Sequence, residues 1–428
     1  MQIIENDKIK EKLYIKKLEN GLTIMFMPRK NTIKKYIIFG TNYGSIDNKF
    51  VVPGENREVE VPNGVAHYLE HKLFEQENGT NSLDVLTALG VDANAYTTTD
   101  HTAYLFEATE NFYEALDELM DYVQHPYFTD ENVEKERGII GQEIMMYDDT
   151  PEWKVYLNTL KSMYKNNPIN IDITGTKETI AKITKETLYD CYNTFYHPSN
   201  MAIVVCGDFD KDEIFKEIEK RLVKNTKNQS EIKRIYPEEP KEIVQDYIEE
   251  KMEVSIPLFT IGIKDDISSL TSKDMVKRQI SVQILLNLLI GKSSKLYNKL
   301  YEENLLQSEP GMDYEFSKNY GFVLLQGQSN NPQKVKEMLI SEFENMKSTG
   351  INKQDFERIK KMVYADYIKS FNSIDGVASG LLMNFFKGIN SFEYIEEFSS
   401  LSVENVENVL REVFNKDRLV LSVISCLE

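Results

Sequence analysis

The sequence predicts an α+β protein made of two homologous domains, each with a mixed or antiparallel sheet whose helices pack on one face. Three observations lead to this prediction. The chain has 428 residues, which is more than one ordinary hydrophobic core accommodates, so two or more domains are expected. A polar segment near the middle divides the chain into two parts of similar length. Both parts show the same order of predicted strands and helices.

The dividing segment is residues 223–246, which contain two prolines and show no apolar periodicity. A polar stretch of this kind between two patterned regions is typical of a linker. We therefore expect an N-terminal domain over residues 1–222, a linker over 223–246 and a C-terminal domain over 247–428.

The internal repeat is clearest in residues 102–144 and 320–367. Each begins with an apolar and aromatic strand and continues into a helix with apolar residues at i, i+3 and i+4. Each then passes through a short loop into a second, charged amphipathic helix. Earlier in each half, residues 36–45 and 257–264 predict another strand that is followed by a helix.

Composition and charge exclude several classes of protein. With 41% hydrophobic and 11% aromatic residues, the chain has the composition of a folded globular protein. A net charge of −19 argues against nucleic-acid binding, which needs a basic surface. Three cysteines without framework spacing indicate a reducing compartment. No apolar run reaches the roughly 18 residues of a membrane span, so we expect a cytoplasmic protein that does not bind membranes.

A candidate metal site lies in the segment GVAHYLEHKLFEQ, residues 64–76, which holds two of the five histidines. On a helix, His67, Glu70 and His71 share one continuous face. Two imidazoles at i and i+4 can bind one cation together, and zinc suits imidazole combined with carboxylate. Glu70 lies beside them and is placed to accept a proton from a water that attacks a carbonyl.

A catalytic zinc site needs a third protein ligand, and a carboxylate is the best candidate. Glu136 and Glu143 are seven residues apart and share one helix face, with isoleucines between them. A buried acid needs a partner or a metal. One of the two glutamates is therefore a candidate ligand and the other a candidate supporting partner. The remaining histidines are expected in turns or in packing: His101, His125 and His197.

A simpler interpretation remains open from these residues alone. The His-x-x-Glu-His pattern is also compatible with an ordinary solvated helix face, and the two glutamates with surface charges on a charged helix.

Several segments resemble the pitrilysin/insulinase/mitochondrial processing peptidase family of zinc metallopeptidases. The order His67-x-x-Glu70-His71 is the inverted zincin motif, and a Glu-x6-Glu pair follows about seventy residues later. The segments LENGLTIMFMPR, GTNYGSID, NAYTTTDHTAYLF and FYHPSNMAIVVCGDF also resemble family segments, in family order. The resemblance covers most of the first half and extends to the second through the repeat, and it implies the processing-peptidase fold.

The resemblance implies a role for each matching residue. His67, His71 and Glu143 would bind one zinc ion per chain, and Glu70 would be the general base. Glu136 would be the supporting acid.

The resemblance also implies how substrate binds. Asn94 and Ala95 match positions where family members hold the substrate backbone, which fits a peptide that adds to the sheet as an edge strand.

One departure from the family pattern concerns partners. Active members carry an Arg and a Tyr seven residues apart in the C-terminal part, and these positions read Tyr301 and Ser308 here. The second half also lacks a His-x-x-Glu-His motif. The resemblance therefore implies a heterodimer in which a homologous partner chain supplies the Arg/Tyr pair, with a homodimer as the second choice.

The predicted function is that of a zinc endopeptidase subunit that hydrolyses short or unfolded peptides, in precursor processing or in turnover. The alternative is a non-catalytic scaffold, or a peptide-binding maturation subunit, on the same fold.

Overall fold

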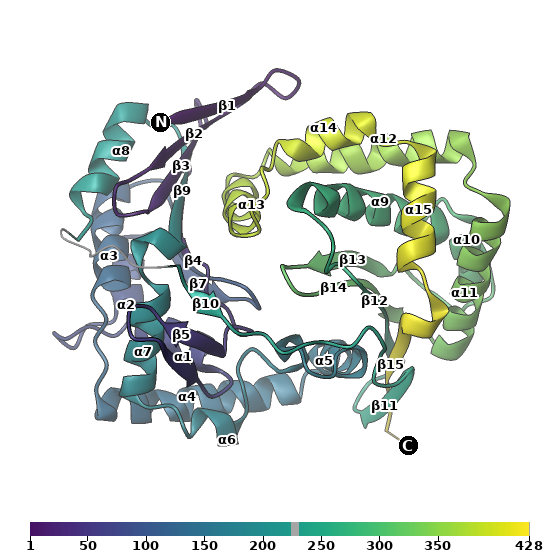
Figure 1. The fold of residues 1–428 in the computed structure, drawn as a ribbon, viewed down its shortest axis with the longest axis horizontal. Helices are drawn as coiled ribbons and strands as arrows, with labels where there is room; N and C mark the ends of the chain where they lie inside the picture. Colours follow the sequence, from purple (N-terminus) through teal and green to yellow (C-terminus); the bar gives the residue numbers. More distant parts are fainter. Residues whose placement is uncertain (224–230, 428) are drawn as a thin grey trace. The chain divides into compact units, whose positions relative to one another are not determined.

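The computed structural model describes residues 1–223 and 231–427, and the chain divides into two compact units (Figure 1). Unit 1 comprises Met1–Ile144, Asp172–Tyr236 and Ile368–Phe386. Unit 2 comprises Met145–Ile171, Pro237–Tyr367 and Lys387–Glu428. Both are mixtures of sheet and helix, which confirms the predicted α+β class.

Unit 1 is built on a seven-stranded sheet of order β1-β2-β3-β9-β4-β8-β7. All pairs are antiparallel except β3 with β9, so the sheet is mixed as predicted. Its strands are β1 Gln2–Asn6, β2 Glu11–Lys17, β3 Thr23–Pro28, β4 Lys35–Thr41, β7 Asp92–Thr97, β8 Thr102–Ala108 and β9 Met201–Gly207. Its larger helices are α1 Val65–Lys72, α2 Ser82–Ala88, α3 Phe112–Gln124, α4 Asp130–Asp148, α7 Lys185–Phe195 and α8 Lys211–Lys220.

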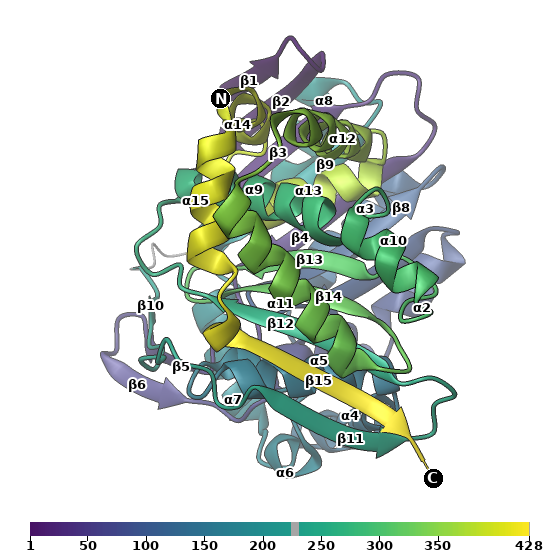
Figure 2. The ribbon, with the colours of Figure 1, turned by 90° about the vertical axis from the view of Figure 1, so that its right-hand side faces the viewer.

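Unit 2 is built on a five-stranded sheet of order β11-β15-β12-β14-β13. Its one parallel pair is β11 with β15, which Figure 2 shows side by side near the C-terminus. Its strands are β11 Tyr247–Met252, β12 Leu258–Asp265, β13 Gly311–Phe316, β14 Gly321–Gln328 and β15 Leu419–Cys426. Its larger helices are α9 Ser272–Ile290, α10 Lys295–Glu302, α11 Pro332–Thr349, α12 Lys353–Ser370, α14 Glu393–Ser400 and α15 Val403–Val413.

The predicted repeat is present in both units. The order β8, α3, α4 in the first half corresponds to β14, α11, α12 in the second. The five strands β3-β9-β4-β8-β7 also correspond to β11-β15-β12-β14-β13, with the parallel pair at the same place.

Each sheet is covered on a second face by a helix from the other half of the sequence. Helix α13, Ile374–Phe386, packs on β4 and β9 of unit 1, and helix α5, Pro151–Met163, packs on β12 and β15 of unit 2 (Figure 1). A glycine in β4 and a glycine in β12 allow these close approaches. A Cβ on Gly40 would lie 2.6 Å from Leu382 Cδ2, and one on Gly262 would lie 2.5 Å from Thr159 Cγ2.

We call α5 and α13 the exchanged helices, because each packs in the unit that is built mainly from the other half of the sequence. They make the two units discontinuous in sequence. The division at 1–222 and 247–428 assigns each helix to the half in which it is encoded, whereas the packing assigns it to the other unit. The order of predicted strands and helices does not indicate which sheet each of these two helices contacts.

The predicted linker is only partly covered by the structure. Residues 224–230 lie outside the described residues, whereas Lys233 and Arg234 form β10, which pairs with β5, Lys49–Val52. With β6, Arg57–Glu60, these strands make a small second sheet in unit 1. Arg234 Nε also donates to Asp47 Oδ1 at 2.9 Å, so this part of the linker is anchored to unit 1.

Over residues 1–223 and 231–427, no helix combines the length and the apolar character that a membrane crossing requires.

Candidate metal centre

Helix α1 is fixed at its start by two glycines, each of which approaches the carbonyl group of the residue before the other. Gly64, at φ +93°, precedes the helix, and a Cβ there would lie 2.5 Å from the carbonyl oxygen of Thr174. A Cβ on Gly175, at φ +75°, would lie 2.5 Å from the carbonyl oxygen of Asn63. Both the positive φ angles and the close approach require glycine, and together they set the direction in which α1 leaves the loop.

Helix α1 is anchored on one side to the core and to helix α4. Val65, Leu69 and Leu73 are buried in the main hydrophobic cluster of unit 1. The hydroxyl of Tyr68 donates a hydrogen bond to the carbonyl oxygen of Val133 on α4. This contact ties together the two helices that carry the predicted metal ligands.

The structure brings His67, His71 and Glu143 together. Their ligand atoms all lie within 4.8 Å of one another. His67 Nε2 is 3.6 Å from Glu143 Oε1, and His71 Nε2 is 3.6 Å from Glu143 Oε2. These separations exceed a hydrogen bond.

The donor set fits zinc. Ligands placed about 2.1 Å from a tetrahedral zinc ion stand about 3.4 Å apart, close to the separations between Glu143 and the two imidazoles. Burial and the neighbouring His71 lower the pKa of His67 to about 3, so this ring is neutral. Its Nδ1 is buried and has no hydrogen-bond partner among the described residues.

Glu136 lies behind His71 rather than among the three ligand atoms. His71 Nδ1 and Glu136 Oε1 are 3.1 Å apart, while His71 Nε2 faces Glu143. A carboxylate bonded to the second ring nitrogen fixes the tautomer and orientation of a ligating histidine. Burial opposes the charged form of Glu136, but the hydrogen bond with His71 and the ammonium of Lys72 hold its pKa below the ordinary value.

Glu70 is buried next to the cluster and accepts a hydrogen bond from the strand β7. Thr97 Oγ1 donates to Glu70 Oε2 at 2.6 Å. Burial raises the pKa of Glu70 to about 7, against the opposing effects of Thr97 and His71. A carboxyl group with a pKa near neutrality can accept and return a proton at physiological pH.

Asn94 and Ala95 lie on β7, the strand that ends at Thr97. In the described part of the chain β7 pairs only with β8, so its other side is an open sheet edge. The Ala95 N–H donates to Asn94 Oδ1 at 2.9 Å. An extended peptide that paired with β7 would run toward Thr97 and hence toward Glu70.

The other three histidines lie elsewhere in unit 1. His101 is buried in the turn between β7 and β8 and bonds Asp100. His125 follows the last turn of α3, and His197 precedes a short 3-10 helix.

Sequence reasoning missed two residues of the site, Thr97 and Lys72. Thr97 is one of three consecutive threonines, and only the register of β7 shows which of them reaches Glu70. Lys72 is fully buried, which is rare for lysine. A signal was available in the helical spacing, because Lys72 comes seven residues after Val65 and three after Leu69, on the apolar face of α1.

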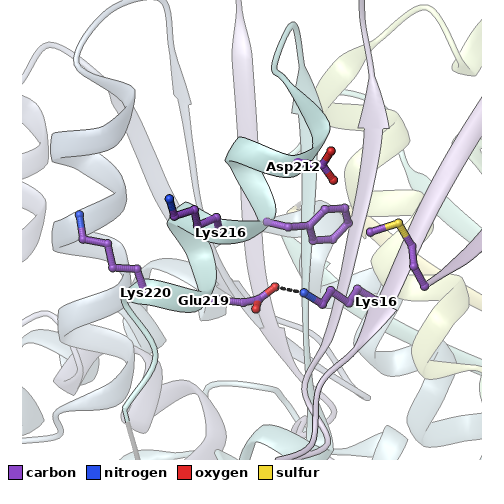
Figure 3. A pocket seen from close by; sticks show the side chains of 7 residues that line it. Lys16, Asp212, Lys216, Glu219 and Lys220 are labelled. Carbon is purple, nitrogen blue, oxygen red and sulfur yellow. Dashed lines mark hydrogen bonds and ion pairs between the residues drawn. The ribbon is translucent and has the colours of Figure 1, made fainter.

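A separate surface hollow of about 340 Å³ lies between β2 and α8 (Figure 3). Lys16 and Glu219 form an ion pair across it, and Lys216 and Lys220 line its side. None of the predicted site residues contributes to this hollow.

Comparisons with known proteins show the family to which the chain belongs. Residues 50–177 match the family described as insulinase (peptidase family M16), and residues 182–363 match the domain described as the peptidase M16 inactive domain. The chain is 38% identical over 419 residues to the uncharacterized zinc protease YmfH of Bacillus subtilis strain 168, covering 98% of this chain and 97% of that protein. It is 25% identical over 385 residues to the uncharacterized zinc protease YmxG of the same organism, covering 87% and 90%.

Solved structures show the same fold. An M16-like peptidase from Alicyclobacillus acidocaldarius superposes with a TM-score of 0.93 at 33% identity, covering 99% of this chain and 100% of that one. A protease from Helicobacter pylori superposes with a TM-score of 0.80 at 20% identity, covering 97% and 100%, which shows likeness of fold alone. The chain therefore belongs to the pitrilysin/insulinase family, peptidase family M16.

Proposed function

We propose that this chain is the zinc-carrying subunit of a peptidase, in which His67, His71 and Glu143 hold one zinc ion. The observation that carries the proposal is the convergence of these three side chains within 4.8 Å of one another, with Glu70 beside them. The spacing of the ligand atoms and the neutral His67 ring support it. The names of the relatives, which are zinc proteases, agree with it.

Each surrounding residue has a distinct task in peptide hydrolysis. When bound, zinc polarises the scissile carbonyl and makes the attacking water more acidic. Glu70 takes the proton of that water and returns it to the leaving amine. Thr97 already donates to Glu70 Oε2, which leaves Oε1 as the oxygen that takes the proton. Glu136 orients the His71 ring through Nδ1.

The substrates that suit this site are short or unfolded peptides. A peptide pairing with the open edge of β7 along Asn94 and Ala95 must present an extended backbone with free N–H and C=O groups. A folded protein keeps most of these groups paired. The proposed compartment is the cytoplasm, and the work is either processing of peptide precursors or peptide turnover.

The proposed assembly is a heterodimer with a homologous chain. The positions at which active family members carry Arg and Tyr are Tyr301 and Ser308 here, and the Tyr301 side chain is exposed on α10. A partner that carries the pair would complete the site. A homodimer is the second choice, because it would lack the pair in every copy.

A second candidate function, a non-catalytic scaffold or peptide-binding subunit, is favoured by the same two positions. The description of residues 182–363 as an inactive domain also agrees with it. In that case the β7 edge would bind peptides, and Glu70 would have no chemical task.

The test is cleavage of a quenched fluorescent peptide by the chain with and without a homologous chain that carries Arg and Tyr. We expect cleavage only in the mixture, reduced by about 10²–10⁴-fold in Glu70→Gln, since general-base catalysis contributes that much. The exposed Glu77→Gln variant is the matched control and should retain full activity. Undiminished cleavage by Glu70→Gln would contradict the assigned role, and cleavage by the chain alone would contradict the heterodimer.

A further inference from the structure

Lys72 is the last residue of α1, and its side chain is completely buried. Its ammonium has two partners, the carboxylates of Glu75 and Glu136. Glu75 forms a close ion pair with Nζ, and Glu136 Oε2 lies 3.4 Å from Nζ. Burying an ammonium is unfavourable unless it is paired and hydrogen-bonded, so a lysine at this position needs both carboxylates.

The two oxygens of Glu136 face different groups. Oε1 lies 3.1 Å from His71 Nδ1, and Oε2 lies 3.4 Å from Lys72 Nζ. His71 Nε2 in turn faces Glu143 at 3.6 Å. A continuous line of contacts therefore runs from Lys72 through Glu136 and His71 to the position of the metal.

Without Lys72, the second oxygen of Glu136 would lose its donor. Glu136 is only 9% exposed, so water would replace that donor poorly, and the carboxylate could turn away from His71. Glu75 matters for the charge balance. Because it pairs with Lys72, the ammonium and this carboxylate together add no net charge next to a dication.

We propose that Lys72 is a positioning residue of the metal centre, which holds Glu136 so that Oε1 faces His71 Nδ1 and His71 Nε2 points at the metal. The inference rests on the proposed zinc site. It concerns zinc affinity, which can be measured on the chain alone, without a partner or a substrate.

The experiment measures the zinc dissociation constant by competition with a chromophoric chelator. The main variant is Lys72→Met/Glu75→Gln, which removes the ion pair without changing the net charge. We expect about tenfold weaker zinc binding, at the lower end of the ten- to hundredfold range for residues that orient metal ligands. The matched control is the surface pair Glu344→Gln/Lys347→Met of unit 2, also three residues apart, which should bind zinc as the wild type does.

A mutational cycle with Glu136→Gln separates positioning from general destabilisation. If Lys72 acts through Glu136, the triple variant Lys72→Met/Glu75→Gln/Glu136→Gln should bind zinc no more weakly than Glu136→Gln alone. The proposal is overturned if the losses of zinc affinity in Lys72→Met/Glu75→Gln and in Glu136→Gln multiply in the triple variant. It is also overturned if Lys72→Met/Glu75→Gln binds zinc with wild-type affinity.

A conservative variant guards against a folding failure. Lys72→Gln/Glu75→Gln keeps a buried hydrogen-bond donor toward Glu136 and should bind zinc more tightly than the methionine version, with the fold checked by circular dichroism. Equal or weaker binding by this glutamine version overturns the proposal. A wild-type chain that binds no zinc overturns the proposed zinc site itself, whereas normal zinc binding by the wild type and by Lys72→Met/Glu75→Gln overturns only the role of Lys72.

Discussion

The two units share one sheet design but place different helices against it. Strands β3-β9-β4-β8-β7 and β11-β15-β12-β14-β13 have the same order, with one parallel pair at the same position. The helix that follows β6 in unit 1 is α1, with eight residues and two histidines. The helix that follows β12 in unit 2 is α9, with 19 residues, and it buries Leu285, Leu286 and Leu289. Unit 2 has this sheet design without a His-x-x-Glu-His motif, so we infer that the design does not require the cluster of His67, His71 and Glu143.

The units also differ in what their buried charges do. In unit 1, the buried Glu70 and Glu136 lie beside the cluster that could hold a metal ion, which comprises His67, His71 and Glu143. In unit 2, Asp265 is buried with permanent partners, because Arg278 Nη1 donates to it at 2.8 Å and the Tyr314 hydroxyl donates at 2.6 Å. One set of charges is proposed to serve function, and the other serves stability.

The largest expected effect on stability tests whether the buried charges of unit 2 matter more for folding than the cluster of unit 1. Asp265→Ala leaves Arg278 and Tyr314 without their shared acceptor, so we expect a loss of about 3 kcal/mol in the free energy of unfolding. His71→Ala, measured in the presence of a chelator, should lose about 1 kcal/mol or less. Urea denaturation followed by circular dichroism gives both values. A larger loss for His71→Ala than for Asp265→Ala would show that the metal site is part of the framework.

The next prediction tests what the units have in common, the exchanged helices α13 and α5. Gly40→Ala and Gly262→Ala each push a methyl group into a helix that already lies in contact, so each should destabilise its unit by about 1–3 kcal/mol. Gly311→Ala is the control, because a Cβ on Gly311 would lie no closer than 3.9 Å to another atom. Gly90 is less suitable because its φ is positive. Gly311→Ala should change stability by well under the effect at Gly40, and equal losses at all three positions would refute close helix packing as the cause.

The smallest expected effect concerns helix α4 of the first half, the counterpart of α12 in the second half. α4 contains Gly138 and Gly141 within its length, and an added Cβ at either position meets nothing within 4 Å. Gly138→Ala should therefore stabilise the protein by about 0.5–1 kcal/mol, since glycine inside a helix is unfavourable relative to alanine. Thermal unfolding in the presence of chelator measures it. A destabilised Gly138→Ala would mean that α4 needs a flexible or closely approached backbone there.

Much of the fold and most of the cluster could be predicted because they depend on local patterns. The spacing of His67 and His71 places both imidazoles on one face of any helix, and the spacing of Glu136 and Glu143 does the same. The choice between these two glutamates could not be made from spacing. It depends on how α1 and α4 pack, which the Tyr68 contact with α4 fixes.

Other features depend on contacts between residues distant in sequence. The packing of α13 on unit 1 and of α5 on unit 2 depends on contacts between distant residues, and the sequence marks these contacts only by a glycine in β4 and a glycine in β12. The burial of Lys72 could not be read from a residue type that is normally exposed. Part of the predicted linker proved to be anchored, because Arg234 finds the buried Asp47 far away in sequence.

The most direct test of the central claim is the zinc content of the purified chain, measured by mass spectrometry for the wild type, His71→Ala, Glu143→Gln and Glu131→Gln. Glu131 is an exposed glutamate on the same helix as Glu143 and serves as the matched control. About one zinc per chain in the wild type and in Glu131→Gln, with loss in His71→Ala and Glu143→Gln, is the predicted result. A wild-type chain without stoichiometric zinc, or full zinc content in Glu143→Gln, would contradict a metal site built from His67, His71 and Glu143.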